Sequence, residues 1–281
     1  MNAFCLVHFG NNKKFLELEL YLIINLKKCT KNHIIYLYSI NDTPDSFVEL
    51  MKTYCNNVIS YDDMNITFNI NFSSYYGHFN LLRTCNFIFA YKLLEYKKIC
   101  LLESDMIILK NIDNIFDLKF PSILIYKPNI LNNYKLIKKV ENYENYEVNG
   151  GIMLIKPSLK LFTRALDKIK IIIKEKFKFP NESLFLLINK YIYNLPYKYN
   201  GTENLLEKYQ KIYNIDMKKY LSILHYACKT YKHLDIIKDG YLESYKNKKK
   251  LHYYFICIFK NLYYDKYNKI ITSFFTKKSD S

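Results

Sequence analysis

Short apolar runs alternate with longer segments of helical periodicity along the first hundred residues of the chain. The pattern predicts strands at residues 3–8, 34–38, 57–61 and 99–102, and helices at about 16–28, 44–54 and 80–95. Thr43-Pro44 supplies a predicted N-cap with proline in the first turn of the second helix. Strand and helix in strict alternation are typical of a parallel sheet with crossover helices. The sequence therefore predicts an α/β fold with a Rossmann-like, mostly parallel sheet and flanking helices.

The second half of the chain continues without an obvious linker. Strands are predicted at 121–126, 152–155 and 223–225, and helices at 158–177 and 180–190. Residues 251–264 are apolar and aromatic, too short to span a bilayer and more typical of a packing helix. Because no internal repeat and no linker rich in Pro, Gly or Ser is visible, we expect a single domain over residues 1–275 and a frayed tail at 276–281.

Composition narrows the class of partner. A net charge of +16 favours anionic partners such as nucleotides, nucleic acid or acidic membrane surfaces. Lysine is spread through the chain rather than gathered, so nucleic acid is the least favoured of these. The seven cysteines are scattered without a Cys-x-x-Cys pair, which indicates neither a zinc site nor a disulfide framework. With no signal peptide and no membrane span visible, a cytoplasmic location is expected.

Residues 99–116, ICLLESDMIILKNIDNIF, carry the most informative acids. Glu103 and Asp105 follow a predicted buried strand, and residues i and i+2 of an extended segment point to the same side. In a parallel sheet, ligands bind beyond the carboxyl ends of the strands, where these acids fall. His225 ends another predicted strand, and carboxylates with an imidazole suit a borderline cation such as Mn²⁺. The three residues are therefore candidate metal ligands.

Each of these residues also has an ordinary structural explanation. Acids at a strand end are often helix caps or surface charges, and a histidine after an apolar run is often a core residue. Arg83, on the helix before the acidic strand, could reach a phosphate or form a surface salt bridge. His8, at the tip of the first strand, is better explained as a packing residue than as a functional one.

The order of the motifs resembles that of glycogenin-like enzymes, glycosyltransferase family 8. In that family an apolar strand enters Asp-x-Asp, and a second apolar run and Asn-Ile-Asp-x-x-Phe follow, as in residues 99–116. Leu82-Arg83-Thr84 falls where the family has a helix lysine near the sugar nucleotide. The segment from Val148 to Ile152, then Lys156-Pro157-Ser158, is similar to the family's Phe-Asn-Ser-Gly-Val followed by Pro-Ser.

Two later motifs extend the resemblance. Asn181-Glu182 stands where the family has Asp-Gln, and His225-Tyr226-Ala227-Cys228 begins like the family's His-x-x-Gly-x-x-Lys-Pro-Trp. The similarity runs from about residue 3 to 275. It implies a single GT-A-type domain with a nucleotide-binding half (1–110), a sugar and acceptor half (111–245) and C-terminal helices (246–275).

The resemblance implies a retaining hexosyltransferase that uses a UDP-sugar donor and Mn²⁺ or another divalent cation. Its partners would be the nucleotide sugar and a glycan or protein acceptor, and it admits a homodimer. The implied metal ligands are Glu103, Asp105 and His225, and the implied catalytic residues are Asn181 and Glu182. The implied donor-binding residues are Phe9, Gly10, Asn11, Arg83, Glu103, Ser104, Asp105, Asn149, Gly150 and Lys232.

The chain departs from the family pattern at several of these positions. Glu103 replaces the first aspartate of the acidic motif and is one methylene longer, and Cys228 replaces a glycine. Asn181 replaces an aspartate, and only Lys232-His233-Leu234 corresponds to Lys-Pro-Trp. These changes motivate an alternative, a weakened relative that binds nucleotide sugar without efficient transfer. A basic nucleic-acid-binding protein is the third interpretation.

Overall fold

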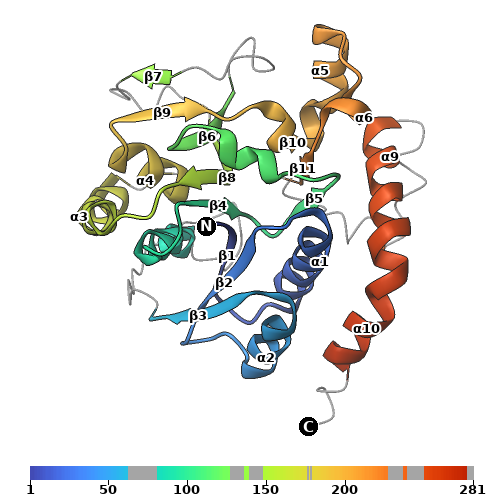
Figure 1. The fold of residues 1–281 in the computed structure, drawn as a ribbon, viewed down its shortest axis with the longest axis horizontal. Helices are drawn as coiled ribbons and strands as arrows, with labels where there is room; N and C mark the ends of the chain where they lie inside the picture. The colour runs from blue at the N-terminus through green and yellow to red at the C-terminus, as the bar shows by residue number, and fades with distance from the viewer. Residues whose placement is uncertain are drawn as a thin grey trace. The chain divides into compact units, whose positions relative to one another are not determined.

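The computed structural model describes residues 1–62, 81–126, 136–138, 148–175, 177, 179–226, 237–238 and 250–276. The chain divides into two units made of interleaved segments. Unit 1 consists of Met1–Asn11, Asn32–Glu103 and Asp113–Pro196, and unit 2 consists of Asn12–Lys31, Ser104–Ile112 and Tyr197–Ser281. Figure 1 shows the fold of both.

In the described part of unit 1, eight strands form one sheet in the order β3-β2-β1-β4-β8-β6-β9-β7 (Figure 1). The strands are β1 (Asn2–His8), β2 (His33–Ser39), β3 (Asn57–Tyr61), β4 (Lys98–Leu102), β6 (Ser122–Ile125), β7 (Leu136–Lys138), β8 (Val148–Ile155) and β9 (Tyr191–Asn194). Strand β1 pairs in parallel with β2 and β4, β2 with β3, and β6 with β9. Strand β8 is antiparallel to β4 and β6, and β7 to β9. The predicted mixed α/β class with a mostly parallel sheet is confirmed.

The helices described in unit 1 are α2 (Asp45–Tyr54), a 3-10 helix (Leu81–Lys92), a short 3-10 turn (Asp113–Asp117), α3 (Leu159–Glu175) and α4 (Pro180–Ile188). Three of them share an apolar cluster with the sheet. The longer 3-10 helix, α3 and α4 pack against one another. Ile88, Ile169 and Phe185 bring them into the same apolar cluster as Ile99 and Ile155 of the sheet. This packing fixes the positions of β4 and β8, the strands next to the candidate site that the next subsection describes.

Three local predictions differ from the structure. The segment predicted as an α-helix at 80–95 is a 3-10 helix at Leu81–Lys92, in which nearly every residue from 85 to 91 is buried. The N-cap of α2 is Pro44, without a side-chain cap, rather than Thr43. Strand β8 begins at Val148, so the two glycines at 150 and 151 lie inside the strand instead of leading into it.

Unit 2 has a small sheet of its own, in the order β10-β11-β5 (Figure 1). Its strands are β5 (Met106–Ile108), β10 (Gly201–Thr202) and β11 (Ile223–His225), and β11 pairs antiparallel to β5. The described helices of this unit are α1 (Lys13–Cys29), α5 (Leu206–Tyr213), α6 (Met217–Tyr220), α9 (Lys250–Phe259), a π-helical turn (Lys260–Tyr264) and α10 (Asp265–Thr276), with short 3-10 turns at Tyr197–Tyr199 and Glu203–Leu205. The second apolar run of residues 99–116 is therefore a strand whose partner lies more than a hundred residues away.

A buried asparagine ties α1 to the edge of this small sheet. The side-chain Nδ2 of Asn25 donates to the backbone carbonyl oxygen of Ile108 at 3.0 Å. The side-chain Oδ1 of Asn25 accepts from the backbone amide of Ile108 at 2.7 Å. The side chain thus replaces a neighbouring strand on this edge of β5. Since an unsatisfied buried backbone group is costly, this contact favours the observed position of β5 beside α1.

Several further features can be compared with the sequence. The described cysteines form no disulfide with one another, and burial raises the pKa of the thiols of Cys5, Cys85 and Cys100. Among the helices that the structure describes, none has the length and apolar character needed to cross a membrane. Some predictions concern residues that the structure does not describe, namely Lys232, Cys228, residues 139–147 and the tail from 277 onward. The functional halves divided at residue 110 stay a prediction.

Candidate functional site

The acidic motif lies where β4 ends and β5 begins. Glu103 directly follows β4 and is the last residue of the segment Asn32–Glu103 of unit 1. Asp105 directly precedes β5 in unit 2. Strands β1 and β4 are parallel neighbours, so their carboxyl ends lie at the same edge of the large sheet. His8, the last residue of β1, and Glu103, directly after β4, therefore lie at the same edge of the large sheet.

In unit 2, strand pairing brings Asp105 beside His225. His225 is paired with Met106 across the antiparallel ladder, and the Tyr226 amide donates to the Asp105 carbonyl oxygen at 2.9 Å. The Asp105 Oδ1 and His225 Nε2 atoms are 3.2 Å apart, and both residues are buried. Two of the three candidate metal ligands are thus held side by side by backbone hydrogen bonds.

The ring nitrogen of His225 that does not face Asp105, Nδ1, has a hydrogen-bond partner of its own. His225 Nδ1 is 2.9 Å from Oδ1 of the buried Asn200. An amide oxygen only accepts hydrogen bonds, so Nδ1 carries a proton. Nε2 then faces the Asp105 carboxylate, either as the second N–H donor of a charged imidazolium or as a lone pair that a cation can bind. This donor set fits a divalent cation that accepts both oxygen and nitrogen ligands.

In unit 1, Glu103 joins a second group of polar side chains. Its amide donates to the Gly151 carbonyl at 3.0 Å, and the Asn181 amide nitrogen donates to its Oε1 at 3.3 Å. Glu182 accepts a hydrogen bond from the Gly150 amide at 2.9 Å. The structure thereby brings Glu103, Gly150 and the predicted catalytic residues of α4 together.

Gly150 is required by the closeness of α4. A Cβ atom at this position would lie 2.8 Å from Glu182 Cγ and 2.9 Å from Asn181 Nδ2. The pairing of β6 with β8 also changes register here, from Ile123–Met153 to Leu124–Asn149, so the glycines lie in a bulge. Paired glycines before a strand indicate that the backbone comes close either to a ligand or to another element. At Gly150 the structure shows a close approach to another element, the helix α4.

At the end of β1, a charged cluster closes on itself. Asp42, in the loop after β2, accepts two hydrogen bonds from the Arg83 guanidinium, at 2.5 and 2.9 Å, and one from the Gly10 amide at 2.9 Å. Gly10 has a φ of +95°, which favours glycine. The guanidinium also lies over the Phe9 ring, 4.8 Å from its centroid. The Arg83 hydrogen bonds lower the pKa of Asp42, more than burial raises it.

His8 packs inside this end of the sheet, as predicted. Its ring stacks on Tyr36 at 5.7 Å between centroids, and its Nε2 is 2.7 Å from the Gly10 carbonyl oxygen. Asn11 and Ser104, two predicted donor contacts, are exposed and half-buried respectively. Asn149 is half-buried, and its Oδ1 accepts from the Gly151 amide at 3.0 Å.

Sequence reasoning missed two residues that organise the site. Asp42 lies three residues after the carboxyl end of β2, as Glu103 lies one residue after that of β4, and this place beyond a strand end could have marked it. Asn200, which orients His225, lies in an irregular stretch before β10, and no local pattern distinguishes it.

Comparisons with known proteins agree with the fold. No protein-family model matches the sequence. An uncharacterized protein of Acanthamoeba polyphaga mimivirus is 26% identical over 243 residues, which covers 80% of each chain. Among solved structures, the bifunctional glycosyltransferase WbbM is similar over 87% of this chain and 49% of its own, with 14% identity and a TM-score of 0.57.

Two further structures share the fold. The glycosyltransferase GlyE of Streptococcus pneumoniae matches over 83% of this chain and 56% of its own, with 17% identity and a TM-score of 0.53. The galactosyltransferase LgtC, solved with donor and acceptor sugar analogues, matches over 82% and 88%, with 12% identity and a TM-score of 0.54. The chain thus spans about half the length of WbbM and GlyE. Its fold is the GT-A type of these glycosyltransferases.

Proposed function

We propose that the protein is a metal-dependent, retaining hexosyltransferase that uses a UDP-sugar donor and a glycan or protein acceptor. The observation that carries this proposal is the Asp105–His225 pair, whose oxygen and nitrogen atoms in unit 2 suit a divalent cation, on a fold that known glycosyltransferases share. The glycogenin-like order of motifs supports the choice of donor and of family.

In this proposal Asp105 and His225 hold Mn²⁺ or another divalent cation. Glu103 is two residues before Asp105 in the chain, so its Cα lies within about 7 Å of that of Asp105 and its carboxylate can supply a further oxygen ligand or bind the ribose. When bound, the cation supplies positive charge for the diphosphate oxygens as the sugar leaves. Asn200 keeps the Nε2 lone pair of His225 directed at the metal position.

The remaining predicted residues take roles toward donor and sugar. Phe9, Gly10, Asn11 and Ser104 would contact the nucleotide, and Arg83 and Lys232 would neutralise phosphate. Asn149 and Gly150 would face the sugar beside Asn181 and Glu182. In the transfer, the bond from the sugar C1 to the diphosphate oxygen breaks and a bond from C1 to an acceptor oxygen forms. The acceptor hydroxyl proton passes to the released diphosphate or to water.

A donor screen tests this function. The protein is incubated with a panel of UDP-sugars and Mn²⁺, and free UDP is measured with and without EDTA. We expect UDP release from at least one donor, abolished by EDTA and restored by excess Mn²⁺. If no donor is hydrolysed or transferred, and neither Mn²⁺ nor UDP raises the melting temperature, the proposal is wrong.

One contact favours the alternative of a nucleotide-sugar-binding protein with weakened transfer. The longer side chain of Glu103 already accepts a hydrogen bond from Asn181, which replaces a family aspartate. Both departures therefore meet in one contact, which draws the Glu103 carboxylate toward α4. Binding of UDP without turnover across the panel would favour the alternative, and a gain of turnover in Glu103→Asp would show that the longer side chain causes the weakness.

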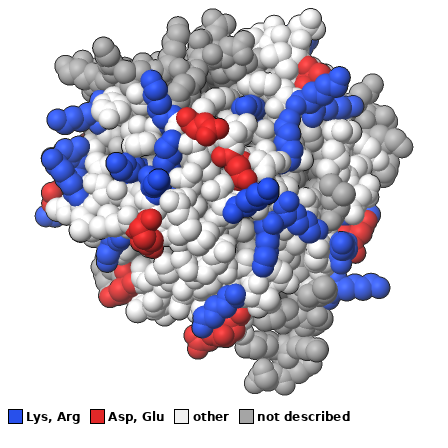
Figure 2. Space-filling model, in the orientation of Figure 1, with Lys and Arg blue, Asp and Glu red and all other residues white. Residues whose placement is uncertain are grey.

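The face drawn in Figure 2 gives no support to the nucleic-acid interpretation. Figure 2 shows basic side chains dispersed over the drawn face, with acidic side chains between them. Binding along a nucleic-acid backbone needs basic residues gathered in a continuous groove or stripe, with aromatics between them for stacking.

A further inference from the structure

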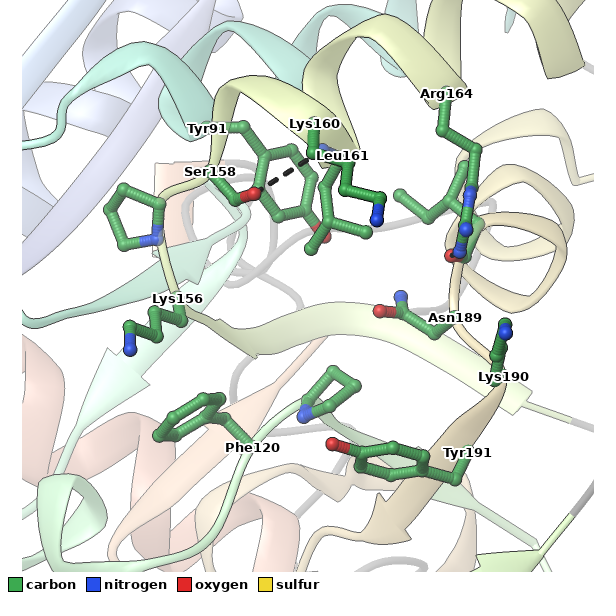
Figure 3. Close-up of a pocket in the computed structure, with 13 residues that line it drawn as sticks. Tyr91, Phe120, Lys156, Ser158, Lys160, Leu161, Arg164, Asn189, Lys190 and Tyr191 are labelled. Atoms are coloured by element: carbon green, nitrogen blue, oxygen red, sulfur yellow. Dashed lines mark hydrogen bonds between the residues drawn. The ribbon is translucent and has the colours of Figure 1, made fainter.

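A hollow lies in unit 1 at the carboxyl end of β8, whereas Gly150 is near the start of this strand. The hollow has a volume of about 470 Å³ and opens between the residues after β8, the start of α3 and the turn that joins α4 to β9. Figure 3 shows side chains from these segments directed toward a common space. Because strands rise about 3.3 Å per residue, Ile155 lies roughly 17 Å from Gly150 along β8. The hollow is therefore separate from the polar group around Gly150.

Among the residues that the structure describes, the charged lining of this hollow is basic. Its cations are Lys156, Lys160, Arg164 and Lys190, and no described aspartate or glutamate lines it. The three lysines are exposed, while Arg164 is half-buried and anchored by a hydrogen bond from Nη1 to the Ile188 carbonyl oxygen at 3.0 Å. Like charges gathered around a hollow repel one another, so an anion bound between them lowers the electrostatic energy.

The start of α3 adds donors of the same sign. This helix of 17 residues begins at Leu159, and the Ser158 hydroxyl caps it by accepting from the Leu161 amide at 3.3 Å, the hydrogen bond drawn in Figure 3. The first-turn amides and the positive end of the helix dipole favour an anion there.

A buried hydroxyl in the wall points to a ligand independently of these charges. Tyr91 is fully buried and lines the hollow, and its hydroxyl makes no hydrogen bond of ordinary length to the described residues. Burial raises the pKa of Tyr91, and the Asn189 amide opposes this rise without cancelling it, so the group stays a neutral O–H donor. In Figure 3 the Tyr91 hydroxyl lies beside Leu161 on the side of Asn189. A buried donor is costly when unmade, and a ligand oxygen in the hollow would satisfy it.

Two aromatic rings form the opposite wall. Phe120 and Tyr191 lie below the lysines in Figure 3, and Tyr191 is 49% exposed, which is unusual for so large a side chain. Lys156 Nζ lies 5.9 Å from the centroid of Phe120. The C–H faces of a sugar ring pack on aromatic rings while its hydroxyls stay available to polar groups, so aromatic and basic walls together suit a sugar that carries an anionic group.

We infer that this hollow binds an anionic sugar, with the phosphate or carboxylate at Lys156, Lys160 and the start of α3, and the ring against Tyr191 and Phe120. The ligand is either a free sugar phosphate or an acidic residue of a glycan chain, which share this chemistry. The inference does not depend on the proposed sugar transfer, because binding here needs neither a donor nor a metal.

Calorimetric titration of the full chain with glucose 6-phosphate tests the inference, with glucose, glucuronate and inorganic phosphate as comparisons. We expect saturable binding of glucose 6-phosphate, at least 10-fold tighter than glucose and inorganic phosphate. The double variant Lys156→Glu with Lys160→Glu should weaken it at least 10-fold. The matched control is Lys170→Glu with Lys174→Glu, which makes the same charge change further along α3 at exposed positions that do not line the hollow.

Two further arms separate the parts of the inference. Tyr191→Leu should weaken glucose 6-phosphate at least 3-fold and leave inorganic phosphate unchanged. Glucuronate oligosaccharides that bind at least 10-fold tighter than glucose 6-phosphate would identify a glycan residue as the ligand, and the reverse order a free sugar phosphate. Equal losses in both lysine variants, no binding of either anionic sugar, or inorganic phosphate binding as tightly as glucose 6-phosphate would each overturn the inference. UDP release, measured on the same variants, should not change.

Discussion

The cluster at the end of β1 and the Asp105–His225 pair are both small polar groups at strand ends, but they are balanced differently. Asp42 is satisfied by the Arg83 guanidinium and the Gly10 amide, so its charge is neutralised within unit 1. In unit 2, Asn200 orients the His225 ring, whose Nε2 faces a carboxylate. In the first arrangement the carboxylate already faces a guanidinium, whereas in the second it faces an imidazole that suits a divalent cation. The proposed cation therefore belongs to the second arrangement.

The largest expected effect comes from removing the carboxylate of the Asp105–His225 pair. Asp105→Asn should reduce UDP release at least 100-fold and abolish the stabilisation by Mn²⁺, since an amide is a weak metal ligand. For the wild type, Mn²⁺ at 100 times its Kd should add about 2.7 kcal/mol, read as a rise in Tm. Asp42→Asn is the matched control and should keep this rise. An Asp105→Asn protein that Mn²⁺ still stabilises equally would remove Asp105 from the metal site.

The next prediction concerns the residue that orients the histidine. Asn200→Ala frees the His225 ring to rotate or change tautomer, and we expect a 10- to 100-fold loss of Mn²⁺ affinity. The affinity is measured by titration of the metal, followed by Tm. Asn200→Asp keeps an oxygen acceptor for Nδ1 and should retain most of the affinity. Equal losses in both variants would indicate a packing role instead.

A pair of glycine variants compares packing with backbone conformation. Gly150→Ala places a Cβ against Glu182 and Asn181 and should lower the free energy of unfolding by about 1–3 kcal/mol. Gly10→Ala meets nothing within 4 Å, so its cost, about 1–2 kcal/mol, comes only from the φ of +95°. Urea unfolding measures both. We expect only Gly150→Ala to recover when Glu182→Ala is added, and no recovery would contradict the steric account.

The smallest effect tests the closed cluster through pH. Because the folded pKa of Asp42 is lowered, its ion pair stabilises the protein above the unfolded pKa of about 3.9, and this contribution is lost as pH falls through the folded pKa. For a partly exposed pair we expect about 1 kcal/mol or less. The difference in urea midpoint between wild type and Asp42→Asn should therefore shrink between pH 6 and pH 3. A difference independent of pH would assign the effect to the hydrogen bond rather than the charge.

The basic hollow extends the comparison within unit 1. There the charged side chains are positive, whereas in unit 2 the imidazole of His225 faces a carboxylate. The two proposed ligands therefore have opposite charge: a cation beside Asp105 and an anion among the basic side chains of the hollow.

The sequence by itself determined the alternation of strands and helices up to β4, the mixed α/β class, and the position of Glu103 and Asp105 after a buried strand. These features follow from local periodicity and from the rule that polar groups collect at strand ends, which need only a few neighbouring residues. The strand at 223–225 was predicted exactly, including His225 as its last residue. Metal binding by these residues stays a prediction.

Only the tertiary structure decided which of these residues meet. The pairing of β5 with β11, the contact of Asn200 with His225, the bond between Arg83 and Asp42 and the closeness of α4 to Gly150 join segments between 25 and more than 100 residues apart. The 3-10 winding of Leu81–Lys92 was also not visible in the sequence, whose periodicity there predicts an α-helix. Contacts of this kind depend on how whole elements pack, and a local pattern in the sequence contains no information about that packing.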